Sequence, residues 1–179
     1  MYKLGITGGI GSGKSTAARF FKKKDTRVFD ADEKAKTHLR KTVALQHRLI
    51  HTFGYQITTD NHLDFKKLSE IAFSSQKEQK ILNGIVWPEV YILLTNAANQ
   101  AEKEGIKLFL VDAALILEAD YIDFFNAILL ITADESVRFK RTLMRKDIQE
   151  HQIKKRMALQ MPDSEKKKLV SFSIENNGD

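Results

Sequence analysis

The chain contains 179 residues with a net charge of +6, 42% hydrophobic residues and no cysteine. This length fits one domain with a sizeable core, and the lack of cysteine excludes disulfides and thiolate metal sites. No signal-peptide pattern or apolar run of membrane-spanning length occurs, so we expect a cytoplasmic protein without a membrane partner. The lysine runs at 22–24 and 166–168 contain no interleaved aromatics, so we interpret them as solvated helix faces rather than nucleic-acid patches.

A glycine-rich stretch directly follows a short alternating run at residues 2–6, which predicts a first strand. Residues 8–15 satisfy G-x-x-x-x-G-K-[ST], the phosphate-binding P-loop. Glycines let the backbone N–H groups approach phosphate oxygens, Lys14 would place its charge between the β- and γ-phosphates, and the Ser15 hydroxyl would hold Mg²⁺. A helical pattern follows, so the positive end of a helix faces the phosphates. We therefore predict a nucleotide-binding site at Gly8, Gly9, Gly11, Ser12, Gly13, Lys14, Ser15 and Thr16.

Two carboxylates follow a second short strand, predicted over residues 27–29. A carboxylate in this place can accept the proton of an attacking hydroxyl or hold a magnesium-bound water. An aspartate after a strand can also cap the next helix. Capping fits Asp30 well, whereas we favour a functional role for Asp32.

The long segment between the second and third strands is mainly helical. The pattern predicts a helix over 31–53 that ends at Gly54, a connection over 55–63, a short helix around 68–73, and a helical stretch over 76–104 with a break or new first turn at Pro88. This segment is too long for a simple crossover. We therefore interpret residues 33–104 as a helical insertion over the carboxyl edge of a sheet, where ligands bind in such folds.

Apolar runs at 107–111 and 127–132 predict strands buried on both faces, and residues 172–174 are a last strand candidate. Helices are predicted over 135–145 and 149–161, with Pro162 interrupting them. Strands that alternate with helices indicate an α/β fold with a parallel sheet.

Two acidic residues follow the strand predicted over 107–111. Asp112 stands directly at its end, where a Walker-B-like carboxylate holds Mg²⁺ directly or through water. Glu118 follows six residues later, and a surface position on a short helix is the alternative for it. We predict that Asp112 shares the metal with Ser15, whereas both interpretations stay open for Glu118.

Arg138, Arg141 and Arg145 recur at helical spacing and therefore share one helix face. Arginines that converge on a transferring phosphoryl group spread its charge, but an exposed basic helix has the same spacing. The spacing alone leaves both readings open. The five histidines form no zinc-binding pattern, and Trp87, beside Pro88, is interpreted as a core residue.

These motifs, in this order, resemble the dephospho-CoA kinase family, and they span nearly the whole chain. The residues that carry the resemblance are Ile6–Thr16, Asp30–Asp32, Phe53-Gly54, Leu63-Asp64, Leu82-Asn83 ahead of Pro88, Asp112–Glu118, Arg141, Arg145, Arg156, Gln160 and Ile174–Gly178. The P-loop alone would name only the superfamily, whereas this ordered set is far more specific.

The resemblance implies a three-layer P-loop kinase fold with a five-stranded parallel sheet. It implies ATP and Mg²⁺ as cofactors and phosphorylation of the ribose 3′-hydroxyl of dephospho-CoA, with Asp32 as the base. Arg141 and Arg145 would belong to a lid over ATP and act with Lys14 in catalysis, while Asp32, Asp112 and Glu118 would face the substrate. The implied parts are a nucleotide-binding core (1–32, 105–135 and 162–179), an acceptor-binding insertion (33–104) and a lid (136–161).

The chain departs from the family pattern at Trp87, where a histidine is common, and at Phe65, where an arginine is common. It also stops just after Asn-Asn-Gly. Two alternative functions stay open at this point. One is another small P-loop kinase that acts on a nucleoside monophosphate or a small metabolite, and the other is a nucleotide-binding paralogue without turnover.

Overall fold

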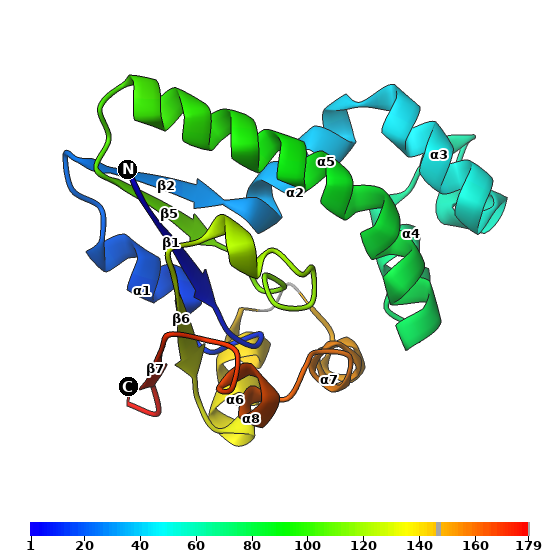
Figure 1. The fold of residues 1–179 in the computed structure, drawn as a ribbon. Coiled ribbons are helices and arrows are strands. Elements are labelled where there is room, and N and C mark those ends of the chain that lie inside the picture. Colours follow the sequence, from blue (N-terminus) through cyan, green and yellow to red (C-terminus); the bar gives the residue numbers. More distant parts are fainter. Residues whose placement is uncertain (146–147, 179) are drawn as a thin grey trace.

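A parallel sheet of five strands forms the centre of the molecule (Figure 1). The structure, a computed structural model, describes residues 1–145 and 148–178. The strand order is β2 (Thr26–Asp30), β5 (Leu108–Asp112), β1 (Tyr2–Thr7), β6 (Ala127–Thr132) and β7 (Phe172–Glu175), and each neighbouring pair is parallel. The predicted α/β class and the five predicted strands of this sheet are confirmed.

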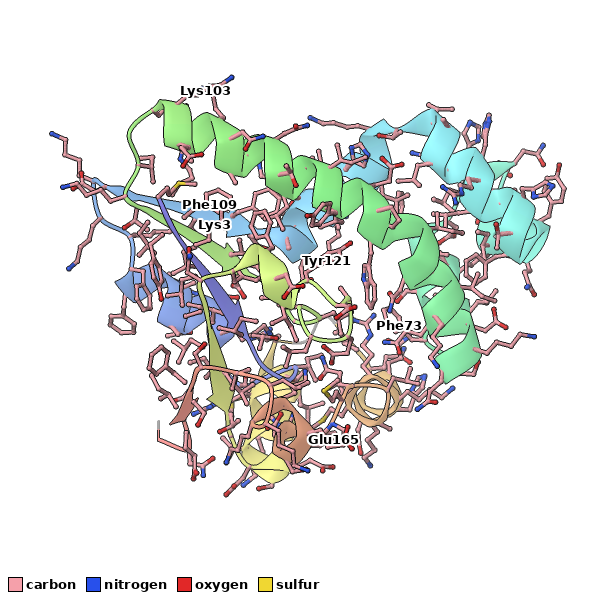
Figure 2. All side chains as sticks on the ribbon, in the orientation of Figure 1. Lys3, Phe73, Lys103, Phe109, Tyr121 and Glu165 are labelled. Carbon is pink, nitrogen blue, oxygen red and sulfur yellow. The ribbon has the colours of Figure 1, made fainter. Side chains whose placement is uncertain are left out.

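Helices cover both faces of the sheet, as the nearly continuous apolar strands require. On one face, Phe109 and Val111 of β5 pack with Val90 and Leu94 of the long helix α5 (Gln76–Lys103). Figure 2 shows Phe109 beneath this helix. On the opposite face, Leu110 packs with Ala18 of α1 (Lys14–Phe20), the helix that follows the glycine loop. The alternation along β5 therefore produces three layers.

The carboxyl ends of the strands bring the predicted site residues to one edge. In the strand register, Asp112 lies opposite both Ile6 of β1 and Asp30 of β2. Because β1 runs directly into the glycine loop, the loop and both acidic strand ends meet at this edge.

The insertion after β2 has a hydrophobic core of its own. It comprises α2 (Ala31–Lys41), α3 (Val43–Phe53), the 3₁₀ turn η1 (Tyr55–Ile57), α4 (Phe65–Ala72) and the first part of α5. Buried side chains from all of these elements form one cluster, which includes Leu39, Leu49, Ile57, Leu68 and Ile85. Figure 1 shows this unit projecting from the sheet.

Three details of the insertion differ from the sequence prediction. The helix predicted over 31–53 is divided at Thr42, whose backbone is extended (φ −102°, ψ 94°). The connection over 55–63 contains a hairpin of two short strands, β3 (Thr58–Thr59) and β4 (His62–Leu63). Its turn residues Asp60 and Asn61 both have positive φ, as expected of these turn formers.

The third difference concerns Pro88, which does not break α5. A proline inside a helix removes one hydrogen bond and crowds the carbonyl of the residue four positions earlier, here Gly84. Packing on both sides of the proline holds the helix together, because Ile85 belongs to the insertion core and Val90 to the sheet core. The helix bends along its length instead of ending (Figure 1).

The chain after β6 forms the remaining helices. These are α6 (Glu135–Met144), α7 (Glu150–Ala158) and the single turn α8 (Asp163–Lys166), while the short turn η2 (Ile122–Phe124) precedes β6. Lys146 and Asp147, within the predicted lid, lie outside the described residues. Among the described residues, none of the helices combines the length and the apolar character that a membrane crossing requires.

Candidate functional site

The glycine loop between β1 and α1 includes positions, among them Gly11 and Gly13, whose conformation and close neighbours only glycine permits. Gly11 (φ 79°) has no room for a side chain, because a Cβ there would lie 2.2 Å from the Arg138 carbonyl oxygen. Gly13 (φ 98°) is left-handed and immediately precedes α1, and a Cβ there would lie 2.4 Å from the Asn176 amide nitrogen. The loop is thus wrapped closely by α6 and by the segment after β7.

Two side chains distant in sequence bond to the loop backbone. The Ile10 N–H donates to the Gln160 side-chain oxygen at 2.9 Å, and the Asn176 amide donates to the Ser12 carbonyl at 2.9 Å. Gln160 follows the helix α7, while Asn176 follows β7. These bonds fix the loop from two sides. The Ser12 N–H is also used, because it donates to the Gly9 carbonyl at 3.1 Å, so an anion would be bound by other N–H groups of the loop.

The charges at this edge centre on Lys14, whose ammonium forms no salt bridge among the described residues. Desolvation lowers the pKa of Lys14, and the nearby carboxylates of Asp32 and Asp112 act in the opposite direction. Lys14 therefore lies within electrostatic range of both aspartates and keeps its donors free for a phosphate.

Asp32 lies in the first turn of α2 and stays open to solvent on one side. The surrounding protein shields its other sides, and this desolvation raises the pKa of Asp32, assisted by repulsion from Asp30 and Asp112. The Asp30 side chain itself accepts the Glu33 N–H at 2.9 Å and caps α2, which confirms the capping role favoured for it. The two aspartates thus differ in role despite their spacing.

Asp112 is buried at the end of β5 and has an unsatisfied oxygen. Desolvation raises its pKa, while the neighbouring Ser15 hydroxyl and Lys14 act against that rise. Its Oδ1 is buried and has no hydrogen-bond partner. An orphaned carboxylate oxygen beside a serine hydroxyl fits a divalent cation that takes its other ligands from phosphates and water. No group of three or more His, Asp or Glu side chains suited to a metal is found within residues 1–145 and 148–178.

Glu118, predicted to face the substrate, forms an ion pair with Lys166, a lysine that was predicted to be exposed to solvent. Its carboxylate forms an ion pair with Lys166 at 2.9 Å and accepts the Met161 N–H at 3.3 Å. Lys166 is fully buried, so the interpretation of the run 166–168 as a solvated helix face is wrong for this residue. A run of three lysines gives no signal that one of them points inward. Only the tertiary contact with Glu118, 48 positions away, reveals it.

The three arginines of α6 and its end have different surroundings. Arg141 donates to the carbonyl oxygens of Asn176, at 2.8 Å, and Gly178. Arg138 packs on the glycine loop, since a Cβ on Gly9 would lie 1.9 Å from a guanidinium nitrogen of Arg138. Arg145 is exposed, and its charge contributes to the lowered pKa of Lys14. All three therefore lie toward the nucleotide side of the sheet edge, but Arg141 is held by backbone carbonyls.

Helix α7 contacts the insertion through Arg156. The guanidinium donates to the Ser69 hydroxyl at 2.8 Å and lies 4.7 Å from the centroid of the Phe73 ring. Figure 2 shows Phe73 between the insertion and α7. A small pocket beside this contact is lined by Ser69, Glu70, Phe73, His151, Gln152, Lys155 and Arg156.

Helix α5 also contacts the loop that follows β5. The Tyr121 hydroxyl donates to the Trp87 carbonyl at 2.7 Å, and Figure 2 shows Tyr121 close to α5. Trp87 is half-buried, so its interpretation as a core residue is wrong. It stands between Ile85 of the insertion core and Val90 of the sheet core, where α5 passes from one core to the other.

A glycine loop and lysine at the β1–α1 junction, carboxylates at neighbouring strand ends and helices that close over the loop define a P-loop kinase. Solved structures show the same fold. A shikimate kinase of Acinetobacter baumannii has a TM-score of 0.55 at 13% identity over 100% of this chain and 86% of its own. A Thermus thermophilus protein has a TM-score of 0.81 at 29% identity over 99% of this chain and 90% of its own.

The sequence comparisons identify the family. The family model for dephospho-CoA kinase matches residues 2–179. A dephospho-CoA kinase of Streptococcus pyogenes is 36% identical over 98% of this chain and 89% of its own length. One of Shouchella clausii is 33% identical over 98% of this chain and 90% of its own. The chain belongs to the dephospho-CoA kinase family and is a phosphotransferase.

Proposed function

We propose that this chain transfers the γ-phosphoryl group of ATP to the ribose 3′-hydroxyl of dephospho-CoA, giving coenzyme A and ADP. The observation that carries this proposal is the placement of Asp32 within electrostatic range of Lys14, in a chain of the dephospho-CoA kinase family. The acceptor then lies between the P-loop and the insertion.

The P-loop binds the ATP phosphates. N–H groups of the loop and the N-terminal end of α1 hold phosphate oxygens. The proposed binding residues are Gly8, Gly9, Gly11, Ser12, Gly13, Ser15 and Thr16, although the Ser12 N–H itself is bonded to the Gly9 carbonyl. Lys14 spans the β- and γ-phosphates, and its positive charge offsets the charge that develops during transfer.

Asp32 acts as the general base. It takes the proton of the ribose 3′-hydroxyl as this oxygen bonds to the γ-phosphorus and the bond to the ADP oxygen breaks. The raised pKa of Asp32 makes it a stronger proton acceptor than an ordinary surface aspartate. Glu118, which is paired with Lys166, supports this substrate edge indirectly.

Ser15 and Asp112 would hold Mg²⁺, because the Asp112 Oδ1 is buried without a partner beside the Ser15 hydroxyl. A Mg²⁺ ion held there would supply positive charge that offsets the charge of the phosphates. Arg145 adds positive charge from the lid, and Arg141 orders the Asn176–Gly178 segment beside the nucleotide. The insertion provides the acceptor surface opposite α7, and a cytoplasmic site of action stays a prediction.

The two alternative functions are not favoured. A kinase for a nucleoside monophosphate or small metabolite would share the P-loop, but the relatives cited above are dephospho-CoA kinases that match this chain over 89–90% of their own length. A paralogue without turnover would not need the residues that are retained here, Lys14, Ser15, Asp32 and Asp112.

The test is an acceptor comparison. ADP release is measured with ATP and Mg²⁺ in the presence of dephospho-CoA, AMP, shikimate or no acceptor, and the product is identified by mass and by the position of its new phosphate. We expect coenzyme A with the phosphate on the 3′-oxygen and little ADP release otherwise. Turnover with AMP or shikimate alone would favour another kinase, and ATP binding without turnover would favour a paralogue.

A further inference from the structure

Lys166 is a buried cation that the proposed mechanism does not use. Its side chain has no solvent exposure, and its ammonium lies 2.9 Å from the Glu118 carboxylate, which is itself only 16% exposed. The second Glu118 oxygen is buried without a partner. Burying an ion pair removes hydration from both charges, and such a pair is weak evidence for stability alone. The burial of the Lys166–Glu118 ion pair therefore calls for an explanation other than stability.

The pair connects three segments around the phosphate site. The Lys166 ammonium lies 3.5 Å from the Ala114 carbonyl oxygen, which also accepts the Thr7 hydroxyl at 3.2 Å. Thr7 is the last residue of β1 before the P-loop, and Ala114 is two residues after Asp112. Glu118 also accepts the Met161 N–H, next to Gln160, which holds the P-loop at Ile10. Figure 2 labels Glu165, the residue before Lys166 in α8 (Asp163–Lys166).

The charge of Lys166 also reaches the phosphate site. Desolvation is the main cause that lowers the pKa of Lys14, and repulsion from Lys166 adds to it. A buried cation is screened less than a surface lysine, so its field acts on bound phosphates over a longer distance.

We propose that Lys166 is a positioning residue for ATP binding and phosphoryl transfer. Its buried ammonium holds the loop between Asp112 and Glu118 against the start of the P-loop, and it adds a fixed positive charge behind the phosphates. Only the phosphoryl-transfer part rests on the proposed function, since ATP binding is measured without an acceptor.

The test compares Lys166→Met with the double variant Lys166→Met/Glu118→Gln. The single variant leaves the Glu118 charge buried and unpaired, so Tm falls by about 10 °C. The double variant removes both charges and recovers most of that loss. We expect its Kd for ATP to stay about tenfold weaker than wild type and its kcat/KM for ATP to fall similarly. ATP affinity equal to wild type in the double variant overturns the proposal.

Two further variants separate charge from folding. Lys166→Arg keeps the positive charge, so we expect ATP affinity within about threefold of wild type even where Tm falls. If ATP affinity follows Tm in every variant, the pair is only structural and the proposal fails. The matched control is Lys107→Met/Asp25→Asn, which removes an exposed pair (3.4 Å) at the amino end of the strands and leaves Tm and Kd unchanged.

The outcomes for the two proposals are distinct. If the wild type makes no coenzyme A but the double variant loses ATP affinity, only the proposed function fails. If the wild type makes coenzyme A and the double variant binds ATP normally, only the role of Lys166 fails.

Discussion

The side-chain oxygen of Gln160 accepts the backbone N–H of Ile10 at 2.9 Å, across 150 positions of the chain. This bond ties the P-loop to the segment that directly follows α7. Because Ile10 sits between the first glycines of the motif and Gly11, a shift of its N–H group would disturb the whole phosphate cradle.

The first prediction concerns this anchor. Gln160→Ala leaves the Ile10 N–H without its partner, so we expect Tm to fall by about 2–4 °C and ATP affinity to weaken several-fold. Thermal unfolding and ATP titration measure the two effects. Gln100→Ala, which removes an exposed Gln100–Glu104 bond of 2.9 Å, is the control and leaves ATP affinity unchanged. Normal ATP affinity in Gln160→Ala would show that the loop holds its shape without this bond.

The second prediction compares two glycines. Gly11→Ala places a Cβ 2.2 Å from the Arg138 carbonyl at a positive φ, so we expect a Tm at least roughly 5 °C lower and no measurable ATP binding. Gly84→Ala adds a Cβ in open space inside α5 and gains roughly 0.5–1 kcal/mol of helix stability. Thermal unfolding measures whether Tm falls in Gly11→Ala and rises in Gly84→Ala. A Gly11→Ala protein as stable as wild type would mean that α6 does not pack on the loop as described.

The third prediction follows from the raised pKa of Asp32. A pKa raised in the folded state means that folded protein holds this proton more tightly than the unfolded chain does. The stability gained in this way is present below the unfolded pKa and is lost as pH rises through the folded pKa. At about pH 7.5, the ionised Asp32 therefore destabilises the protein without ligand. Asp32→Asn should raise Tm there by a few degrees.

The pH dependence provides the check on this third prediction. The Tm difference between Asp32→Asn and wild type should shrink as pH falls toward the pKa of the folded carboxyl, because wild-type Asp32 then becomes neutral too. A difference that stays constant with pH, or a lower Tm for Asp32→Asn at neutral pH, would contradict the assigned direction of the shift.

The fourth prediction concerns the contact between α7 and the insertion. Arg156→Ala removes the bond to Ser69 and the contact with the Phe73 ring, so we expect amide hydrogen exchange in α4 and α7 to become roughly tenfold faster. Lys155→Ala changes the adjacent exposed residue and serves as the matched control. Unchanged exchange in Arg156→Ala would mean that other contacts hold the two elements together.

Local chemistry made most of the fold predictable from the sequence. The apolar runs at 107–111 and 127–132 predicted the buried strands β5 (Leu108–Asp112) and β6 (Ala127–Thr132). The P-loop motif predicted the junction between β1 and α1. The errors arose where tertiary packing overrides local preference. Pro88 stays inside α5 because two cores hold the helix, and the turn at Thr42 has no strong breaker in the sequence.

The residues of the candidate site also fall into two groups, those that local sequence patterns predicted and those that depend on tertiary contacts. Lys14, Ser15, Asp32 and Asp112 were predicted because each follows a predicted strand or lies in a motif, and the structure brings them near one another. Their roles stay predictions. The burial of Lys166 was not predicted, because it depends on a partner distant in sequence, Glu118. The roles of the arginines could not be separated by helical spacing either. Only the structure shows that Arg141 bonds to backbone carbonyls near the C-terminus whereas Arg138 packs on the loop.

The most direct test of the account is the rate of coenzyme A formation from ATP and dephospho-CoA by wild type, Asp32→Asn and Asp30→Asn, with ATP affinity measured for each. Asparagine caps helices as well as aspartate does, so we expect Asp30→Asn to keep a rate within about threefold of wild type. Asp32→Asn should lose at least about 100-fold in kcat while it still binds ATP, because the proton acceptor is gone. A rate for Asp32→Asn close to that of wild type would contradict the assignment of Asp32 as the base.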